Sequence, residues 1–356
     1  MRRLCRIRRA SPAEKEKNMF CLQTGNPAAD LALNLLIFVL GTAVLVKGSD
    51  LFVDSASAIA RSWGVSELVI GLTLVSIGTS LPELASSVYA AIRGEGTFII
   101  GNIVGSNVTN IALILGIGIA GVREMPFERR MLRRDGAVMM LVYLLCAGLF
   151  AVPLQETAAG VRRGIDWRGG ILLLLLCAGY LYLLFRQSAQ EPGKAPEERQ
   201  PFAVAGNLLL LLLGIAMITA GAKGMVDPVV WGMHRLGVSM MVISSTVVAF
   251  GTSVPELAVT VAGIVKHHHD IALGNIIGSC VFNILLIFGV TACIHPLILE
   301  PGPAGVFNLA WMEVTGAALL LFMAAGKTVL RRRTGILLLL FYAVFMLFNL
   351  RMALRG

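Results

Sequence analysis

Ten apolar stretches, each long enough for a helix that crosses a lipid bilayer, are the feature that most restricts how this chain can fold. A helix needs about 20 mostly apolar residues to cross the hydrocarbon core. Only helices and closed barrels satisfy their own backbone hydrogen bonds there, and these stretches lack the polar and apolar alternation of a barrel strand. The sequence therefore predicts an all-α membrane protein with ten transmembrane helices, at residues 31–47, 66–92, 97–121, 134–153, 168–186, 203–222, 238–265, 270–294, 306–326 and 334–351.

Charged residues make up 14% of the chain, whereas a typical soluble domain has about 25%. The formal net charge of +9 would suggest a nucleic-acid partner for a soluble protein. Here most Lys and Arg residues lie between the apolar stretches, as membrane topology requires, so we expect the lipid bilayer as a partner and no nucleic acid. The cysteines form no CxxC motif, and we expect no disulfide framework, zinc site or other cofactor.

Positive charge also predicts orientation, because short loops rich in Lys and Arg stay in the cytoplasm. The richer of the two alternate sets of loops includes the central linker. The linker is therefore expected in the cytoplasm, and both termini are expected on the outer side of the inner membrane. The basic N-terminal tail favours the opposite orientation. Its first eighteen residues contain no apolar segment, so they do not resemble a cleavable signal peptide.

Two blocks of sequence occur twice. GTSLPELA at 78–85 and GNIVGSNVTNIALI at 101–114 match GTSVPELA at 251–258 and GNIIGSCVFNILLI at 274–287, each displaced by 173 residues. One displacement shared by both blocks indicates two homologous halves. We expect a basic tail at 1–30, a first repeat at 31–186, a cytoplasmic linker at 187–201 and a second repeat at 202–356.

Each half contains five of the predicted helices. An odd number of crossings leaves the chain on the opposite side of the membrane, so the second half must enter the membrane upside down relative to the first. The sequence therefore predicts two inverted five-helix repeats, an arrangement typical of transporters that bind their substrates near the middle of the bilayer.

Glu83 and Glu256 occupy equivalent positions in the middle of apolar stretches. A charge there costs about 2.5 to 3.5 kcal/mol on insertion scales, and a bound cation would offset that cost. A Thr and a Ser precede each Glu by four and three residues, so in a helix they share its face. These hydroxyl residues are Thr79, Ser80, Thr252 and Ser253.

A proline stands directly before each glutamate. Pro82 and Pro255 cannot donate a backbone hydrogen bond to the carbonyl four residues earlier, so we expect each helix to break and expose carbonyl oxygens. The second block adds a companion helix with a Ser and an Asn four residues apart on one face. These residues are Ser106 and Asn110 in the first half, and Ser279 and Asn283 in the second.

All of these predicted ligands are oxygen atoms. Ca²⁺ accepts about six to eight such oxygens with flexible geometry, whereas Mg²⁺ prefers to keep its water. Two carboxylates neutralise one divalent ion, and Na⁺ takes the same ligands. We therefore hypothesise that Ca²⁺ and Na⁺ occupy the same pocket in turn.

The doubled GTSxPE and GNxxGSxxxN blocks resemble the alpha repeats of the sodium/calcium exchanger family, within the calcium/cation antiporter superfamily. The resemblance covers both halves. It implies ten helices, alternating access between inverted halves, and antiport of Na⁺ for Ca²⁺ across the inner membrane. It also implies that Glu83, Glu256, Thr79, Ser80, Thr252, Ser253, Ser106 and Ser279 are metal ligands, with carbonyl donors at Ser76 and Ala249.

Two features distinguish this sequence within the family. Members have either Asn or Asp at the positions of Asn110 and Asn283, and two amides here leave the ion stoichiometry and any K⁺ dependence open. Cys280 departs from the repeat, because its counterpart is Asn107.

Other functions stay open beside Na⁺/Ca²⁺ antiport. A proton-coupled Ca²⁺ antiporter would use one glutamate to carry protons, although such members usually have an extra acidic residue in the GN-containing helix, which this sequence lacks. A cation channel is less favoured, since a channel needs no competition between ions. An enzyme is not expected, because the apolar stretches contain no Ser/His, paired-Asp or HExxH arrangement.

Overall fold

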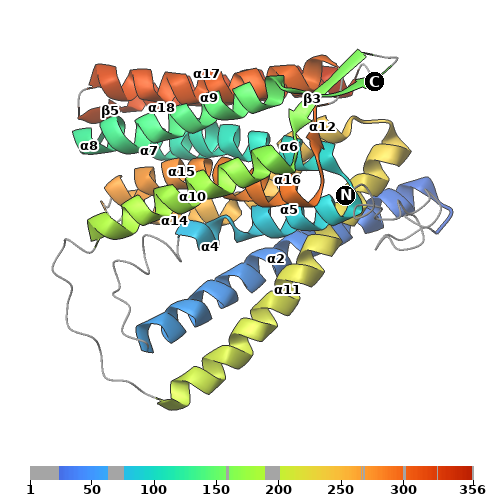
Figure 1. Cartoon of the computed structure of the whole chain (residues 1–356), viewed down its shortest axis with the longest axis horizontal. Helices are drawn as coiled ribbons and strands as arrows, with labels where there is room; N and C mark the ends of the chain where they lie inside the picture. Colours follow the sequence, from blue (N-terminus) through green and yellow to red (C-terminus); the bar gives the residue numbers. More distant parts are fainter. Residues whose placement is uncertain are drawn as a thin grey trace.

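The computed structural model describes residues 24–62, 76–157, 160–188, 201–265, 267, 269–299, 302–326 and 328–354. Within these ranges the chain is mostly helical (Figure 1). The predicted tail is described only from residue 24, and the predicted linker lies outside the described residues between 189 and 200.

The elements of the first half follow the repeated blocks. They are α2 (Pro27–Ser62), α4 (Ser76–Thr79), α5 (Leu81–Arg93), α6 (Gly96–Val108), the π-helix η2 (Thr109–Leu115), α7 (Gly116–Gly121), β1 (Glu124–Pro126), α8 (Arg129–Met131), the π-helix η3 (Leu132–Gly136), α9 (Ala137–Ala151), β2 (Pro153–Thr157), β3 (Gly160–Ile165) and α10 (Trp167–Ser188).

The second half repeats this order closely. Its elements are α11 (Pro201–Leu236), α12 (Met240–Ile243), the π-helix η4 (Ser244–Val248), α13 (Ala249–Thr252), α14 (Val254–Val265), α15 (His269–Phe282), the π-helix η5 (Asn283–Phe288), α16 (Gly289–Ile294), β4 (Leu297–Ile298), α17 (Pro303–Gly326), β5 (Val329–Arg331) and α18 (Arg332–Ala353).

The described residues contain 8 helices that are long and apolar enough to cross a membrane, and a bent pair, Met240–Thr252 with Val254–Val265, brings the number to as many as 9. These spans match nine of the ten predicted stretches. The remaining stretch, 66–92, is described only from residue 76, where α4 and α5 lie. The chain is therefore a multi-pass membrane protein.

Two helices are longer than the sequence predicts. The predicted helices at 31–47 and 203–222 correspond to α2 and α11, each of 36 residues. A helix of that length measures about 54 Å, whereas the hydrocarbon core is about 30 Å thick. The predicted stretches are shorter because they stop near charged residues such as Asp50. A charged residue interrupts the run of apolar residues, but the helix continues through it.

Glycines allow α2 and α11 to pack closely. A Cβ atom added at Gly221 would lie 2.5 Å from the backbone nitrogen of Leu45, and one added at Gly41 would lie 2.5 Å from the carbonyl carbon of Gly224. Figure 1 shows this pair running obliquely to the other helices. The backbones of α2 and α11 therefore leave no room for even a methyl group at these points.

We predict that Gly221→Ala lowers the thermal stability of the purified protein, because the two backbones must move apart, at a cost of about 1–3 kcal/mol. Gly206→Ala is the matched control on the same helix, where an added Cβ meets nothing within 4 Å. That change should leave stability unchanged or raise it, since Ala favours helices over Gly. Thermal unfolding in detergent measures both. Equal transition temperatures for the two variants would show that α2 and α11 do not approach each other closely at Gly221.

The two companion helices form the centre of the molecule. The spans Gly96–Gly121 and Ala272–Ile294 are each 83% buried, whereas the other six unbroken spans are between 17% and 39% buried. The outer helices instead expose apolar side chains such as Leu209 and Leu340, as expected of surfaces that face lipid. The residues predicted on the companion helices therefore lie in the protein interior.

The connections between helices form five short strands within the described ranges, which the all-α prediction did not include. β1 pairs with β5, β2 with β3, and β3 with β4, all antiparallel. Two of these pairings, β1 with β5 and β3 with β4, join the two halves. Backbone groups at the helix ends thus satisfy their hydrogen bonds with each other, which no local pattern in such short segments could reveal.

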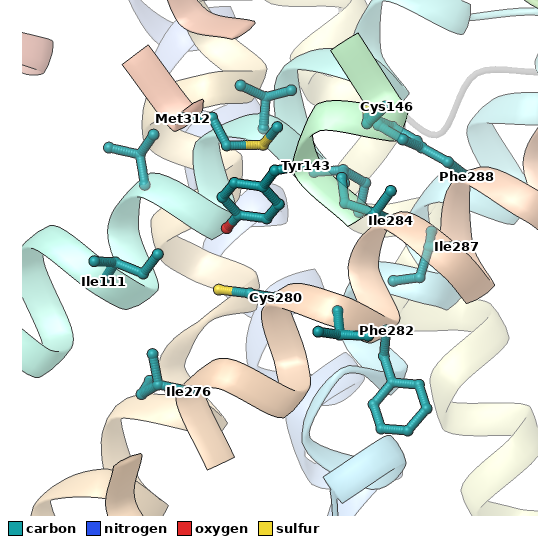
Figure 2. Close-up of a cluster of buried hydrophobic side chains, with 14 of the residues drawn as sticks. Ile111, Tyr143, Cys146, Ile276, Cys280, Phe282, Ile284, Ile287, Phe288 and Met312 are labelled. Carbon is teal, nitrogen blue, oxygen red and sulfur yellow. The ribbon is translucent and has the colours of Figure 1, made fainter. Parts of the chain in front are cut away.

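An apolar cluster packs against the second companion helix, the span Ala272–Ile294. Figure 2 shows Met312 from α17 beside Tyr143 from α9, whose hydroxyl points toward Cys280 from α15. All three side chains are fully buried. The position of Cys280 therefore lies at the boundary between this apolar cluster and the polar centre of the molecule.

Candidate functional site

Two broken helices carry the glutamates. α4 ends at Thr79 and α5 begins at Leu81, and α13 ends at Thr252 and α14 begins at Val254. The residue between each pair, Ser80 or Ser253, has a backbone conformation near φ −90°, ψ 7° or φ −83°, ψ 10°. Each break stands two residues before a proline, as the missing proline donor predicts. It places Ser80 and Ser253 where their hydroxyls face the other half.

Each glutamate accepts a hydrogen bond from the broken helix of the other half. The Ser253 hydroxyl donates to Glu83 Oε1 at 3.2 Å, and the Ser80 hydroxyl donates to Glu256 Oε1 at 3.2 Å. The Ser279 hydroxyl also donates to Glu256 Oε1, at 3.4 Å. Glu83 and Glu256 both have 0% exposure. The two carboxyl groups therefore lie at the crossing of the broken helices, inside the protein.

The threonines and companion-helix serines also meet across the halves. The Thr79 and Ser279 hydroxyls lie 3.5 Å apart, and the Ser106 and Thr252 hydroxyls lie 3.5 Å apart. These two contacts are equivalent under the 173-residue displacement. The structure thus brings together eight of the predicted residues, Glu83, Glu256, Thr79, Ser80, Thr252, Ser253, Ser106 and Ser279.

Asn102 and Asn275 belong to this cluster, although the sequence analysis did not select them. The Thr252 hydroxyl donates to Asn102 Oδ1 at 3.4 Å, and the Thr79 hydroxyl donates to Asn275 Oδ1 at 3.4 Å. The amide of Asn102 donates to Ser86 and Ser87, and that of Asn275 donates to Thr260, each at 3.4 Å. These two asparagines connect each companion helix to the broken helices of both halves.

A signal for these asparagines was present in the sequence. Each is the Asn of a GN pair that occurs in both blocks, and each stands four residues before Ser106 or Ser279. Residues four apart share a helix face. The same spacing argument that selected Asn110 and Asn283 on one side therefore also applies to Asn102 and Asn275 on the other.

Several buried polar atoms of this region have no hydrogen-bond partner among the described residues. They are Glu83 Oε2, Glu256 Oε2, Asn110 Oδ1 and Nδ2, and Asn283 Oδ1. A buried polar group without a partner costs about 1–3 kcal/mol, and more if it is charged. Asn110 and Asn283 lie at the start of the π-helices η2 and η5, and such segments are frequent at functional sites. Four of the five atoms are oxygens, which suits a hard cation.

The two predicted carbonyl donors begin the short helices before the breaks. Ser76 is the first residue of α4, and Ala249 is the first residue of α13. The Ala249 carbonyl accepts hydrogen bonds from the Ser253 backbone N–H at 3.2 Å and from the Thr252 hydroxyl at 3.3 Å. Ligation by this oxygen stays a prediction, and it would compete with these two bonds.

Comparison with known proteins gives one consistent result. The family model described as sodium/calcium exchanger protein matches residues 33–186 and again residues 206–351. The sodium/calcium exchanger MaX1 of Methanosarcina acetivorans is 35% identical over 350 residues, which cover 89% of this chain and 98% of that protein. The inner membrane protein YrbG of Escherichia coli K12 is 34% identical over 281 residues, covering 76% of this chain and 83% of that protein.

A solved structure shows the same fold. The sodium-calcium exchanger NCX_Mj, in crystals soaked with Na⁺ and Sr²⁺, superposes with a TM-score of 0.60 at 31% sequence identity, and the match covers 88% of this chain and 97% of that one. The family model matches both halves, and the relatives match nearly from end to end. The chain belongs to the sodium/calcium exchanger protein family.

Proposed function

We propose that this chain is a secondary active antiporter that exchanges Na⁺ for Ca²⁺ across the membrane, at a site formed by Glu83 and Glu256. Membership of the sodium/calcium exchanger family supports the reaction. The observation that carries the site is the pair of fully buried glutamates, each with one oxygen held by a serine of the other half and one oxygen without a partner among the described residues.

The proposed ligands suit Ca²⁺ better than a softer or smaller ion. Ca²⁺ takes about six to eight oxygens from carboxylates, carbonyls and amides in flexible geometry. Two glutamates would neutralise its charge, and Na⁺ would use the same oxygens, so binding of one ion excludes the other. We assign as metal ligands Glu83, Glu256, Thr79, Ser80, Thr252, Ser253, Ser106, Ser279, Asn110, Asn283, Ser76 and Ala249.

We further propose ten transmembrane helices in two inverted five-helix repeats that expose this site to each side in turn. Helices of the two halves correspond at nearly constant displacement, as α2 does with α11 and α6 does with α15. The paired contacts of Ser80 with Glu256 and of Ser253 with Glu83 support a twofold relation between the halves. Antiport requires that the protein does not switch the side to which its site opens while the site is empty. Two buried carboxylates without a cation would prevent that switch, because an uncompensated charge inside the membrane is costly.

We propose that the protein lies in the inner membrane with both termini on the outer side. The name of the Escherichia coli relative, an inner membrane protein, supports the membrane. The excess of Lys and Arg in the loops on the side of the central linker supports the orientation. Cysteine labelling of Asn26 and Leu354 variants from outside intact cells tests this orientation. If neither position is labelled, the orientation is wrong.

Ion flux in proteoliposomes tests the proposed function. With Na⁺, K⁺ and H⁺ gradients imposed separately, we expect Ca²⁺ uptake only when Na⁺ leaves the vesicle by the same protein, at clamped pH and without K⁺. Uptake that follows a proton gradient would instead establish a proton-coupled antiporter, and uptake that needs K⁺ would establish a K⁺-dependent one. Ca²⁺ flux without any countertransported ion would establish a channel.

A further inference from the structure

The two halves differ at one contact beside the glutamates. Positions 107 and 280 are equivalent in the repeated blocks but hold Asn and Cys. The side-chain amide of Asn283 donates to Asn107 Oδ1 at 2.9 Å. The equivalent contact in the other half joins Asn110 to Cys280, and a thiol is a much weaker acceptor than an amide oxygen. The Cys280 thiol also lies 4.0 Å from the backbone carbonyl of Asn107.

This difference changes how the two central amides are held. Asn110 and Asn283 both have 0% exposure. Among the described residues, Asn283 lacks a partner only for its Oδ1, whereas Asn110 lacks a partner for both Oδ1 and Nδ2. Asn283 is therefore held at its nitrogen by an amide oxygen, whereas the side chain of Asn110 has only the weaker contact with the Cys280 thiol.

An amide can ligate a cation only through its oxygen, because its nitrogen carries two donor hydrogens. A hydrogen bond at Nδ2 fixes which end of Asn283 is free. Asn107 is itself oriented, since its Nδ2 lies 3.5 Å from the Met312 sulfur, which leaves its Oδ1 for Asn283. Asn283 Oδ1 is thus prepared for a cation, whereas Asn110, with only a thiol beside it, is oriented mainly by the ion itself, and that ordering reduces affinity.

We propose that Asn107 is a positioning residue of the ion site: it orients Asn283 as a cation ligand, and Cys280 gives Asn110 only the weaker support of a thiol. The inference rests on the proposed function. It makes the two halves unequal in their ligands although their glutamates are equivalent. The attraction between an ion and an oriented oxygen dipole grows with the charge of the ion, so Asn107 favours Ca²⁺ over Na⁺ at the shared site.

Equilibrium binding of radioactive Ca²⁺ to the purified protein, with Na⁺ as competitor, tests the proposal. Asn107→Ala removes the acceptor, and we expect the half-saturating Ca²⁺ concentration to rise about fivefold, as for the loss of one hydrogen bond. The Na⁺ concentration that displaces half of the bound Ca²⁺ should fall, since Ca²⁺ loses more than Na⁺. In an Asn283→Ala background the same change should have no further effect, because the residue acts only through Asn283.

Asn308→Ala is the control for a purely structural loss. Asn308 is another fully buried asparagine, which bonds to Ser245 at 3.0 Å and to Asn349 at 3.2 Å. Its replacement should lower thermal stability and leave the half-saturating Ca²⁺ concentration unchanged. This control separates weakened binding from weakened folding.

Three results would overturn the proposal. The first is an Asn107→Ala protein with wild-type Ca²⁺ affinity, and the second is an equal loss of Ca²⁺ affinity on Asn107→Ala in the wild-type and Asn283→Ala backgrounds. The third is complete loss of binding in Asn283→Ala alone, which would show that Asn283 is not one replaceable ligand among several. A wild-type protein that binds no Ca²⁺ would overturn the proposed function together with this inference. The two failures can therefore be told apart.

Discussion

Glu83→Gln is expected to abolish Na⁺/Ca²⁺ exchange, and Glu256→Gln is expected to do the same. Glutamine has nearly the same shape and keeps an oxygen for the serine hydroxyl, so each change removes mainly the charge. One carboxylate cannot neutralise a divalent ion in a site with 0% exposure, where Coulomb terms are large. Sodium-driven Ca²⁺ uptake into proteoliposomes measures the loss, which should reach the background of vesicles without protein.

Glu313→Gln is the matched control for these variants. Glu313 also lies within a membrane span, in α17, and its equivalent position in the first half is Met140. Among the residues that the structure describes, its carboxylate makes no hydrogen bond to the cluster around Glu83, so exchange should persist. Wild-type exchange in Glu83→Gln or Glu256→Gln would show that the substituted glutamate is not part of the ion site. Loss of exchange in all three variants would point to a general effect of removing acids from the membrane.

Thr252→Val is expected to reduce exchange by about tenfold or more, because the proposed interaction of the hydroxyl with the charged ion is lost. Valine keeps the branched shape and removes only the hydroxyl, which lies 3.5 Å from the Ser106 hydroxyl and 3.4 Å from Asn102 Oδ1. Thr252→Ser keeps the hydroxyl and should retain most of the activity. The half-saturating Ca²⁺ concentration and the maximal rate of uptake should be measured for both.

Thr219→Val is the control for the loss of a threonine hydroxyl in a helix. Thr219 lies on α11, and its only hydroxyl hydrogen bond among the described residues is a local one, to the Ile215 carbonyl at 2.8 Å, so its replacement should leave exchange unchanged. Equal activity of Thr252→Val and the wild type would show that this hydroxyl has a packing role alone. Equal loss in Thr252→Val and Thr252→Ser would assign the effect to shape.

Much of this architecture follows from local patterns. Apolar runs of sufficient length predict spans, and the described residues have membrane-length spans at nine of the ten predicted positions, with α4 and α5 in the described part of the tenth. The prolines before Glu83 and Glu256 predict the helix breaks, because a missing backbone donor acts at a fixed distance along the chain. The repeated blocks predict which residues are equivalent, and the equivalent contacts of Ser80 and Ser253 agree with that.

Other features depend on how the halves meet, which no local pattern encodes. Sequence spacing placed Ser80 on the face of Glu83, yet in the structure its hydroxyl donates to Glu256 of the other half. Asn102 and Asn275 acquire their role only because each accepts a hydrogen bond from the opposite half. The length of α2 and α11 was underestimated because their continuation packs helix on helix through glycines instead of extending the apolar pattern.

The most direct test of the account is the position of the ion. In crystals of this protein grown with Ca²⁺, the anomalous signal should show one strong peak between Glu83 and Glu256, with an oxygen of each within about 2.3–2.6 Å. A peak that contacts only one of the two carboxylates, or none between them while Ca²⁺ binds elsewhere in the protein, would contradict the shared site.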